Sequence, residues 1–162
     1  MSEKELKESN YRNYINNHIS NVKIAFIKYG KILAKEFNIN YNTLSDHINN
    51  HDHTKYSEEE FEGYRQYFHP CSDETPNKEL FDLAWRHHYK NSPHHPEYWV
   101  DEDNNIIIDM EPIYIAEMLL DWEAMSMYFN NNTYDYYMKE KDNKPLSENT
   151  KKFIEKVINI FK

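Results

Sequence analysis

The sequence predicts an all-α fold, a bundle of about six helices that forms a single domain over residues 1–162 around one core. Apolar residues recur at alternating steps of three and four along most of the chain, which is the period of a helix with one buried face. Capping residues and prolines mark where these runs begin and end. Hydrophobic residues make up 39% of the chain and aromatic residues 15%, which favours an aromatic-rich core over disorder.

The first helix is predicted over residues 2–37. Its apolar positions follow the helical period and place His18 in the buried seam: Tyr11, Ile15, His18, Val22, Ala25, Tyr29 and Ile32. A histidine on an apolar stripe is more often a satisfied core residue than a ligand. The position of His18 alone therefore does not indicate a function.

Two shorter helices are predicted next, each from a capping pattern. Thr43, with Asp46 three residues later, predicts the N-cap of a helix that continues through the His51-Asp52 pair. Ser57, followed three residues later by Glu60, is typical of a capping box, in which the Glu60 carboxylate has a structural role at the helix start. That helix would present Phe61, Tyr64 and Phe68 on one face.

The middle of the chain alternates between loop and helix. A polar loop is predicted over residues 71–77, and the helical period resumes over residues 80–90. Pro93 and Pro96 then end the helix. Residues 98–109 predict a small hairpin with its turn near the Asp103-Asn-Asn105 segment.

Two further helices are predicted in the C-terminal third. Pro112 suits the first position of a helix that extends to Phe129. A polar, tyrosine-rich linker is expected after it. Ser147 then predicts the N-cap of a last amphipathic helix.

Net charge limits the class of partner. The formal charge is −9, and no Lys/Arg-rich run forms a local stripe, so double-stranded nucleic acid is a poor candidate partner. A small anionic substrate is compatible with this charge, because a metal and a few convergent basic side chains can hold it. The net charge therefore leaves a small anionic molecule as a possible partner.

Cysteine content and hydropathy limit the compartment and the metal ligands. Cys71 is the only cysteine, which excludes an internal disulfide and a thiolate zinc cluster. No stretch approaches the roughly 18 apolar residues of a membrane span, and the first residues are charged. A cytoplasmic protein without membrane contact is expected, and any metal must be held by histidine and carboxylate.

The histidines and one carboxylate indicate such a metal site. Nine histidines occur in the chain. Imidazole together with carboxylate suits divalent transition metals such as Fe, Mn, Zn, Ni or Co better than Ca²⁺. Asp121 lies in an apolar helical run beside Met118 and Trp122, where an unpaired carboxylate is costly to desolvate. The structural alternative is that Asp121 accepts hydrogen bonds from tyrosine or tryptophan.

The spacing of these residues resembles that of the HD-domain superfamily of metal-dependent phosphohydrolases. His18 precedes His51 by 33 positions, and Asp52 precedes Asp121 by 69. In that superfamily a helical fold brings a histidine, an adjacent His-Asp pair and a distant aspartate to one metal. The resemblance extends from about Tyr11 to Tyr128 and implies a metal held by His18, His51, Asp52 and Asp121.

Other segments refine the resemblance. The sequence His-Asp-His-Thr-Lys, which ends at Lys55, is similar to the His-Asp-x-x-Lys form of the HD-GYP cyclic-dinucleotide phosphodiesterases, although the GYP signature is missing here and this chain is shorter. The complete pattern of motifs also looks like that of a small uncharacterised HD-like family of bacteria and their phages. That kinship implies no substrate.

The resemblance also implies roles for further residues. His88, with His94 or His95, would hold a second metal, and Asp52 would bridge the two ions. The alternative for the His94-His95 pair is a proline-rich surface loop. Lys55 would neutralise charge on a bound phosphate or assist the leaving oxygen.

Three more residues are candidates around this centre. Arg86 and Lys90, four positions apart, are secondary candidates for binding phosphate, although an exposed basic pair is usually only a solvated face. Glu117 lies one helical turn before Asp121 and is a candidate for orienting a ligand histidine.

A metal-dependent phosphohydrolase that acts on a nucleotide or a related small phosphoester is therefore the leading hypothesis, with one or two metal ions. One alternative is a nucleotide-binding protein that sequesters its ligand without hydrolysis. Another is an HD-type di-iron oxygenase. The presence of all four core ligands disfavours a degenerate site, and an iron-dependent oxygen-consumption assay would separate hydrolase from oxygenase.

Overall fold

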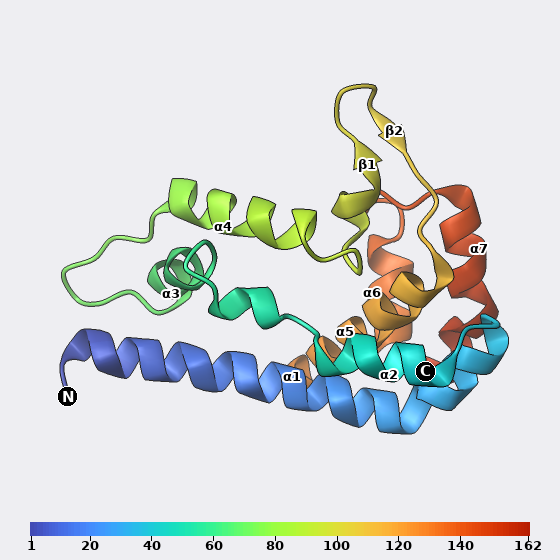
Figure 1. The fold of residues 1–162 in the computed structure, drawn as a ribbon, viewed down its shortest axis with the longest axis horizontal. Helices are drawn as coiled ribbons and strands as arrows, with labels where there is room; N and C mark the ends of the chain where they lie inside the picture. Colours follow the sequence, from blue (N-terminus) through green and yellow to red (C-terminus); the bar gives the residue numbers. More distant parts are fainter.

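A 34-residue helix, α1 (Glu3–Glu36), runs along most of the molecule, and the other elements pack along it (Figure 1). The computed structural model describes residues 1–162 and is all-α, with one small hairpin, as predicted. The seven α-helices exceed the expected six by one. The remaining α-helices and strands are α2 (Tyr41–Asn49), α3 (Phe61–Phe68), α4 (Lys78–Lys90), β1 (Val100–Asp101), β2 (Ile106–Ile107), α5 (Pro112–Phe129), α6 (Thr133–Glu140) and α7 (Glu148–Val157).

The predicted N-cap of α2 was wrong. Asn40 caps this helix, and its side chain accepts a hydrogen bond from the Thr43 backbone N–H at 2.9 Å. The helix also ends at Asn49, so His51 and Asp52 lie in the turn that follows. Asp52 has a φ of 58°, a left-handed conformation that aspartate and asparagine tolerate better than most residues. This turn directs the two side chains inward.

The capping-box interpretation of Ser57 and Glu60 was also wrong. Residues 58–60 form a turn, and α3 begins at Phe61. The Ser57 hydroxyl donates to the Thr54 carbonyl instead of capping the helix. Glu60 is completely buried, because donors from another helix and from Thr54 surround its carboxylate. The local sequence favours a capping box. In the fold, however, Thr54 and His87 of α4 give the Glu60 carboxylate more hydrogen bonds than the cap would.

Helix α6 replaces the linker that was expected after α5. Asn132 caps it by accepting from the Asp135 backbone N–H at 2.8 Å. Thr133 and Tyr137, one turn apart, are fully buried on its inner face. Because α6 has only these two fully buried residues, its helical period is too weak to identify from the sequence.

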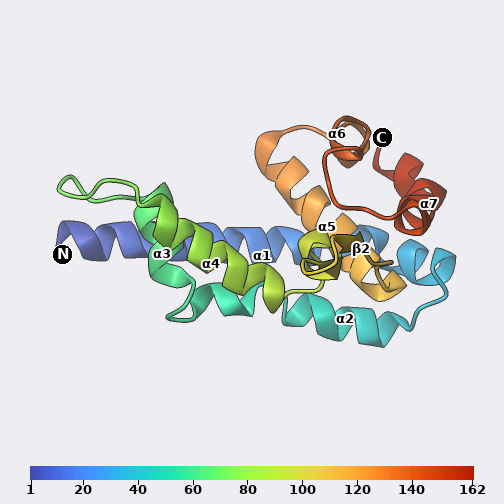
Figure 2. The same cartoon turned by 90° about the horizontal axis from the view of Figure 1, so that it is seen from above.

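The start of α5 and that of α7 agree with prediction, with Pro112 in the first turn of α5 and Ser147 capping α7. The hairpin pairs Val100 with Ile107 and Asp101 with Ile106 in antiparallel register. Figure 2 shows α2 on one side of α1 and α5, and α6 and α7 on the other. None of the helices has the length and apolar character required to cross a membrane.

Buried apolar residues form one large cluster of 21 residues and one small cluster of five. The larger cluster joins the C-terminal half of α1 to α2, α5, α6 and α7. The smaller one joins the N-terminal half of α1 to α3 and α4. On α1, His18 lies between Ile15 of the small cluster and Val22 of the large one. Polar side chains therefore meet at the boundary of two apolar regions, where both hold the backbone in place.

Candidate metal centre

Four buried side chains from three parts of the fold converge at this boundary. His18 comes from α1, His51 and Asp52 from the turn after α2, and Asp121 from α5. Their ligand atoms all lie within 4.8 Å of one another. His18 Nε2 is 2.8 Å from Asp121 Oδ1 and 3.4 Å from Asp52 Oδ2. The structure thus brings together the four residues that the sequence assigned to one metal.

The spacing of these four atoms suits a metal ion. His51 Nε2 lies 3.5 Å from Asp52 Oδ2, 3.4 Å from Asp121 Oδ1 and 3.4 Å from His18 Nε2. Ligands about 2.0–2.2 Å from a shared ion are separated by roughly 3.0–3.5 Å from their neighbours. Five of the six separations in this group are therefore close to those of a tetrahedron or of adjacent octahedral positions.

A second group uses the other oxygen of Asp52. His88 from α4, together with His94 and His95 from the loop after it, lies within ligand distance of that oxygen. Asp52 Oδ1 is 3.3 Å from His88 Nε2 and 3.4 Å from His94 Nε2. His88 Nε2 and His95 Nε2 are 3.0 Å apart. Asp52 is therefore shared, with Oδ2 facing the first group and Oδ1 facing the second.

Two buried atoms at this centre lack a hydrogen-bond partner, namely Asp52 Oδ1 and His94 Nε2. They are close to each other, but the contact does not have hydrogen-bond geometry. A buried polar atom without a partner costs about 1–3 kcal/mol, so such atoms are rare in native proteins. Coordination of a cation would satisfy both atoms, and the His and carboxylate donors fit a divalent transition metal.

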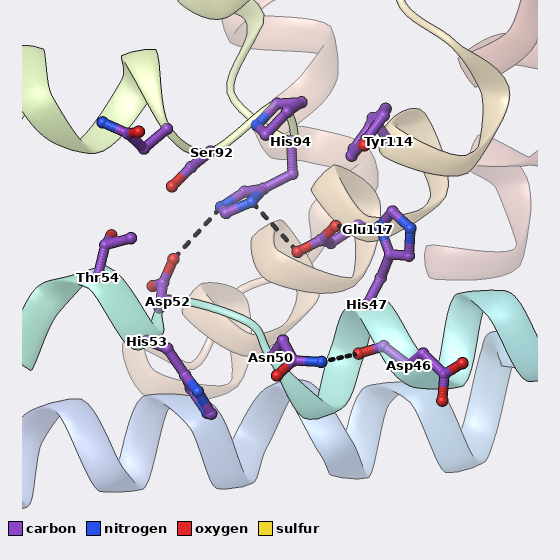
Figure 3. Close-up of a pocket in the computed structure, with 12 residues that line it drawn as sticks. Asp46, His47, Asn50, Asp52, His53, Thr54, Ser92, His94, Tyr114 and Glu117 are labelled. Carbon is purple, nitrogen blue, oxygen red and sulfur yellow. Dashed lines mark hydrogen bonds and ion pairs between the residues drawn. The ribbon is translucent and has the colours of Figure 1, made fainter.

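Glu117 on α5 orients the histidines from behind (Figure 3). Its Oε1 lies 3.0 Å from His51 Nδ1 and 3.2 Å from His94 Nδ1, and its Oε2 lies 3.3 Å from His47 Nδ1. Figure 3 shows the His94 ring between Glu117 and Asp52. A carboxylate that accepts from Nδ1 fixes the tautomer and leaves Nε2 free to bind a metal.

Glu60 occupies the equivalent place in the second group. Its Oε2 lies 3.2 Å from His88 Nδ1, and its Oε1 lies 2.9 Å from His87 Nδ1. Thr54 also donates to Glu60 at 2.9 Å. Sequence reasoning gave no role to His87 or His47 and a capping role to Glu60. The one sequence signal for these residues is that His47 precedes His51 by four positions, which would place both on one face of the helix that the sequence predicts there.

The carboxylates make this region favourable for positive charge. Burial lowers the pKa of His18, but hydrogen bonds to Asp121 and Asp52 outweigh that effect and raise the pKa to about 9. Burial raises the pKa of Asp52, yet the nearby positive charges of His51 and Lys55 bring it well below its usual value. Asp121 behaves in the same way, through its hydrogen bonds to His18 and His51. All of these carboxylates are ionised at neutral pH.

Lys55 stands beside the shared aspartate. It belongs to a short 3₁₀ helix, His53–Tyr56, and its ammonium is 2.9 Å from Asp52 Oδ2. Burial lowers the pKa of Lys55, but the Asp52 charge outweighs this and raises the pKa above its usual value. The side chain, 20% exposed, is therefore a fixed positive charge at the edge of the centre.

Arg86 and Lys90 are not part of this arrangement. Both extend from α4 to Glu102 of the hairpin, with ion pairs of 3.0 Å and 3.4 Å. Arg86 also contacts the Tyr89 hydroxyl at 3.1 Å. The structure places this basic pair in a surface ion-pair network, and it does not bring the pair to the buried histidines.

Two cavities flank the centre. One, the polar cavity, has a volume of about 330 Å³ and is lined almost entirely by polar residues, among them His47, His94 and Glu117 (Figure 3). The other, of about 270 Å³, is rich in aromatic side chains and includes Lys55 and Asp121. Asp52 lines both cavities. The centre is thus accessible from two sides of different chemical character.

Comparison with known proteins identifies a family but no activity. No curated protein and no solved structure gives a significant match to this chain. The model of a family of unknown function, DUF5662, matches residues 7–160, which include both histidine groups and the carboxylates that orient them. This chain therefore belongs to the DUF5662 family.

Proposed function

We propose that this protein is a metal-dependent phosphohydrolase that acts on a nucleotide or a related small phosphoester. One or two divalent transition-metal ions would be held by His18, His51, Asp52 and Asp121 and by the group around His88. The observation that carries the proposal is the position of Asp52, each of whose oxygens faces a different histidine group. The motif spacing shared with the HD-domain phosphohydrolases supports the same reaction class.

The donor set suits hydrolysis. When bound, a divalent transition metal supplies Lewis acidity, which activates water near neutral pH and offsets negative charge on a phosphoryl group. The first group offers four protein atoms, so a six-coordinate ion held there would keep two positions free for water and substrate. Glu117 and Glu60 keep the imidazole rings in place before substrate arrives. Such preorganisation avoids reorienting the ligands during the reaction.

Lys55 supplies the positive charge that a phosphoryl group requires beside these ligands. Its ammonium is held 2.9 Å from Asp52 Oδ2 and lines the aromatic cavity. A phosphate oxygen that enters there would accept a hydrogen bond from Lys55 Nζ. Because negative charge builds up on the phosphoryl oxygens and leaving group during hydrolysis, Lys55 would lower the barrier through this contact.

The experiment is a hydrolysis screen with Mn, Fe, Co or Ni. Its substrates are nucleoside monophosphates, cyclic mononucleotides and cyclic dinucleotides. We expect turnover of at least one substrate, and we expect Lys55→Ala to lower kcat on the order of 10²–10³-fold while metal stays bound. Lys90→Ala is the matched control, because Lys90 pairs with Glu102 at the surface and should leave kcat unchanged. Loss of metal in Lys55→Ala would instead assign Lys55 a structural role.

Two other outcomes would replace the proposal. Tight nucleotide binding without turnover on any substrate would identify a sequestering protein. Oxygen consumption that requires iron and an organic substrate would identify an oxygenase. Neither outcome contradicts the metal centre, so this experiment tests the reaction separately from metal binding.

A further inference from the structure

The aromatic cavity has the metal-binding groups at its base and apolar side chains on its walls. His18, Asp52, His88, His95 and Asp121 line its inner end. Tyr14 of α1, Phe68 of α3, Phe81 and Trp85 of α4, and Met125 of α5 form the walls. A small molecule in this space would therefore touch metal ligands with one end and flat apolar surfaces with the other.

The polar cavity on the opposite side meets the same centre from behind. The residues shared with the metal groups are Asp52, His94 and Glu117, and Glu117 faces the Nδ1 atoms rather than the Nε2 atoms. Figure 3 shows this side, where the Asn50 side-chain amide donates to the Asp46 backbone carbonyl at 2.8 Å; Asp46 also belongs to the lining. No lysine or arginine lines it. An anionic substrate is therefore better matched by the aromatic cavity, which contains Lys55.

Charge limits how many phosphates the aromatic cavity accepts. Lys55 is the only lysine or arginine in its lining, and its ammonium already faces Asp52. One phosphoryl group can lie between Lys55 and the metal ligands. A second or third phosphate would extend along Phe68, Phe81 and Trp85, where no positive side chain would compensate its charge.

The walls favour a flat ring. Phe81 is a central ring, with its centroid 5.7 Å from that of Tyr64 and 5.7 Å from that of Phe68, and both pairs are edge-to-face. Phe68 is 55% exposed, so its ring surface is available to a ligand. Stacking of a base on an aromatic side chain contributes about 1–3 kcal/mol.

We infer that this cavity binds a phosphomonoester with a single phosphoryl group and an aromatic ring, such as a nucleoside monophosphate, and discriminates against polyphosphates. This inference rests on the proposed function for the placement of the phosphoryl group at the metal ligands. The ring packs between the α3–α4 side chains and Tyr14, and the phosphoryl group contacts Lys55.

Binding is tested first, with non-hydrolysable probes. Metal-loaded protein is titrated calorimetrically with phenylphosphonate and with methylphosphonate, which carry the same anionic group with and without a ring. We expect phenylphosphonate to bind at least about 5-fold more tightly, the lower end of the stacking range. Equal affinities would overturn the inference, whether or not the protein hydrolyses any ester.

A matched pair of variants locates the ring. Phe68→Leu changes the cavity wall, whereas Phe129→Leu makes the same substitution at a similarly exposed site on α5 that does not line this cavity. We expect Phe68→Leu to weaken phenylphosphonate binding by about 3-fold or more and to leave methylphosphonate unchanged, with no effect from Phe129→Leu. Equal behaviour of the two variants would place the ring elsewhere and overturn the inference.

Turnover separates this inference from the proposed function. We expect kcat/KM for adenosine monophosphate to exceed the values for ribose 5-phosphate and adenosine triphosphate by at least about 10-fold each. If kcat/KM for ribose 5-phosphate or for adenosine triphosphate equals the value for adenosine monophosphate, the inference is refuted. The proposed hydrolase function would still stand. Selective phenylphosphonate binding without any turnover would refute the hydrolase and leave the cavity assignment intact.

Discussion

Glu117 provides a sensitive test of the metal centre, because one carboxylate orients histidines of both groups. Its Oε1 faces His51 Nδ1 at 3.0 Å and His94 Nδ1 at 3.2 Å, and its Oε2 faces His47 Nδ1 at 3.3 Å. In Glu117→Gln the amide NH₂ replaces one of these oxygens and must point its hydrogens at an imidazole N–H. At least one histidine therefore loses its acceptor in either amide orientation, and the negative charge is lost.

We expect this substitution to weaken metal binding about 10- to 100-fold, the range seen when a partner of a ligand histidine is removed. That range corresponds to about 1.4–2.8 kcal/mol. The assay is a competition titration of Mn²⁺ or Zn²⁺ against a chelator of known affinity, with circular dichroism to confirm the fold. Metal affinity should fall at both groups if Oε1 accepts hydrogen bonds from His51 and His94 together.

Glu123→Gln is the control for this titration. Glu123 lies on the same helix, is partly buried and contacts none of the histidines. The Glu123→Gln variant should bind metal with the same affinity as the unmodified protein. If Glu117→Gln matched the unmodified protein in affinity and stoichiometry, the proposed orienting role of Glu117 would be incorrect.

Three further predictions concern the shared aspartate of the metal centre and two other parts of the fold. Asp52→Asn, which tolerates the left-handed φ of 58°, should abolish metal uptake in elemental analysis while circular dichroism stays helical. Gly63→Ala should lower the free energy of unfolding by about 1–2 kcal/mol in urea titrations, because its Cβ would lie 2.6 Å from the Leu80 carbonyl oxygen and this overlap outweighs the helix-propensity gain. Hydrogen bonds from Arg65 lower the pKa of Glu74 from 4.5 to about 2, so this pair stabilises the protein above pH 4.5 and the contribution is lost as pH falls towards 2. Glu74→Gln should flatten that part of the pH–stability profile, and an unchanged slope would contradict the assignment.

The sequence was most informative where local signals and tertiary packing agree. The apolar period of α1 places His18 on a buried face, and the apolar run of α5, which is buried on all sides from Ile115 to Trp122, buries Asp121. Pro112 and Ser147 mark helix starts by local chemistry alone. The motif intervals then suggested which buried polar residues meet. Convergence of His18 with Asp121 at 2.8 Å agrees with that expectation.

Elsewhere the deciding contacts come from residues distant in sequence. The capping pattern at Ser57 and Glu60 is locally reasonable, but His87 and His88 on α4 draw the Glu60 carboxylate inward. The pair Arg86 and Lys90 is fixed by Glu102, which is brought alongside by a hairpin. The partners in these interactions lie 12 to 28 positions apart, far beyond the steps of three and four residues on which periodicity and capping rules depend, so those rules cannot predict them.

Anomalous diffraction from crystals loaded with Mn²⁺ or Zn²⁺ tests the central claim most directly. If Asp52 joins the two histidine groups through its separate oxygens, two peaks should appear beside it, about 3.5–4 Å apart. One should lie among His18, His51 and Asp121, and the other among His88, His94 and His95. A single peak at saturating metal would contradict the second site, and peaks only elsewhere on the molecule would contradict the metal centre itself.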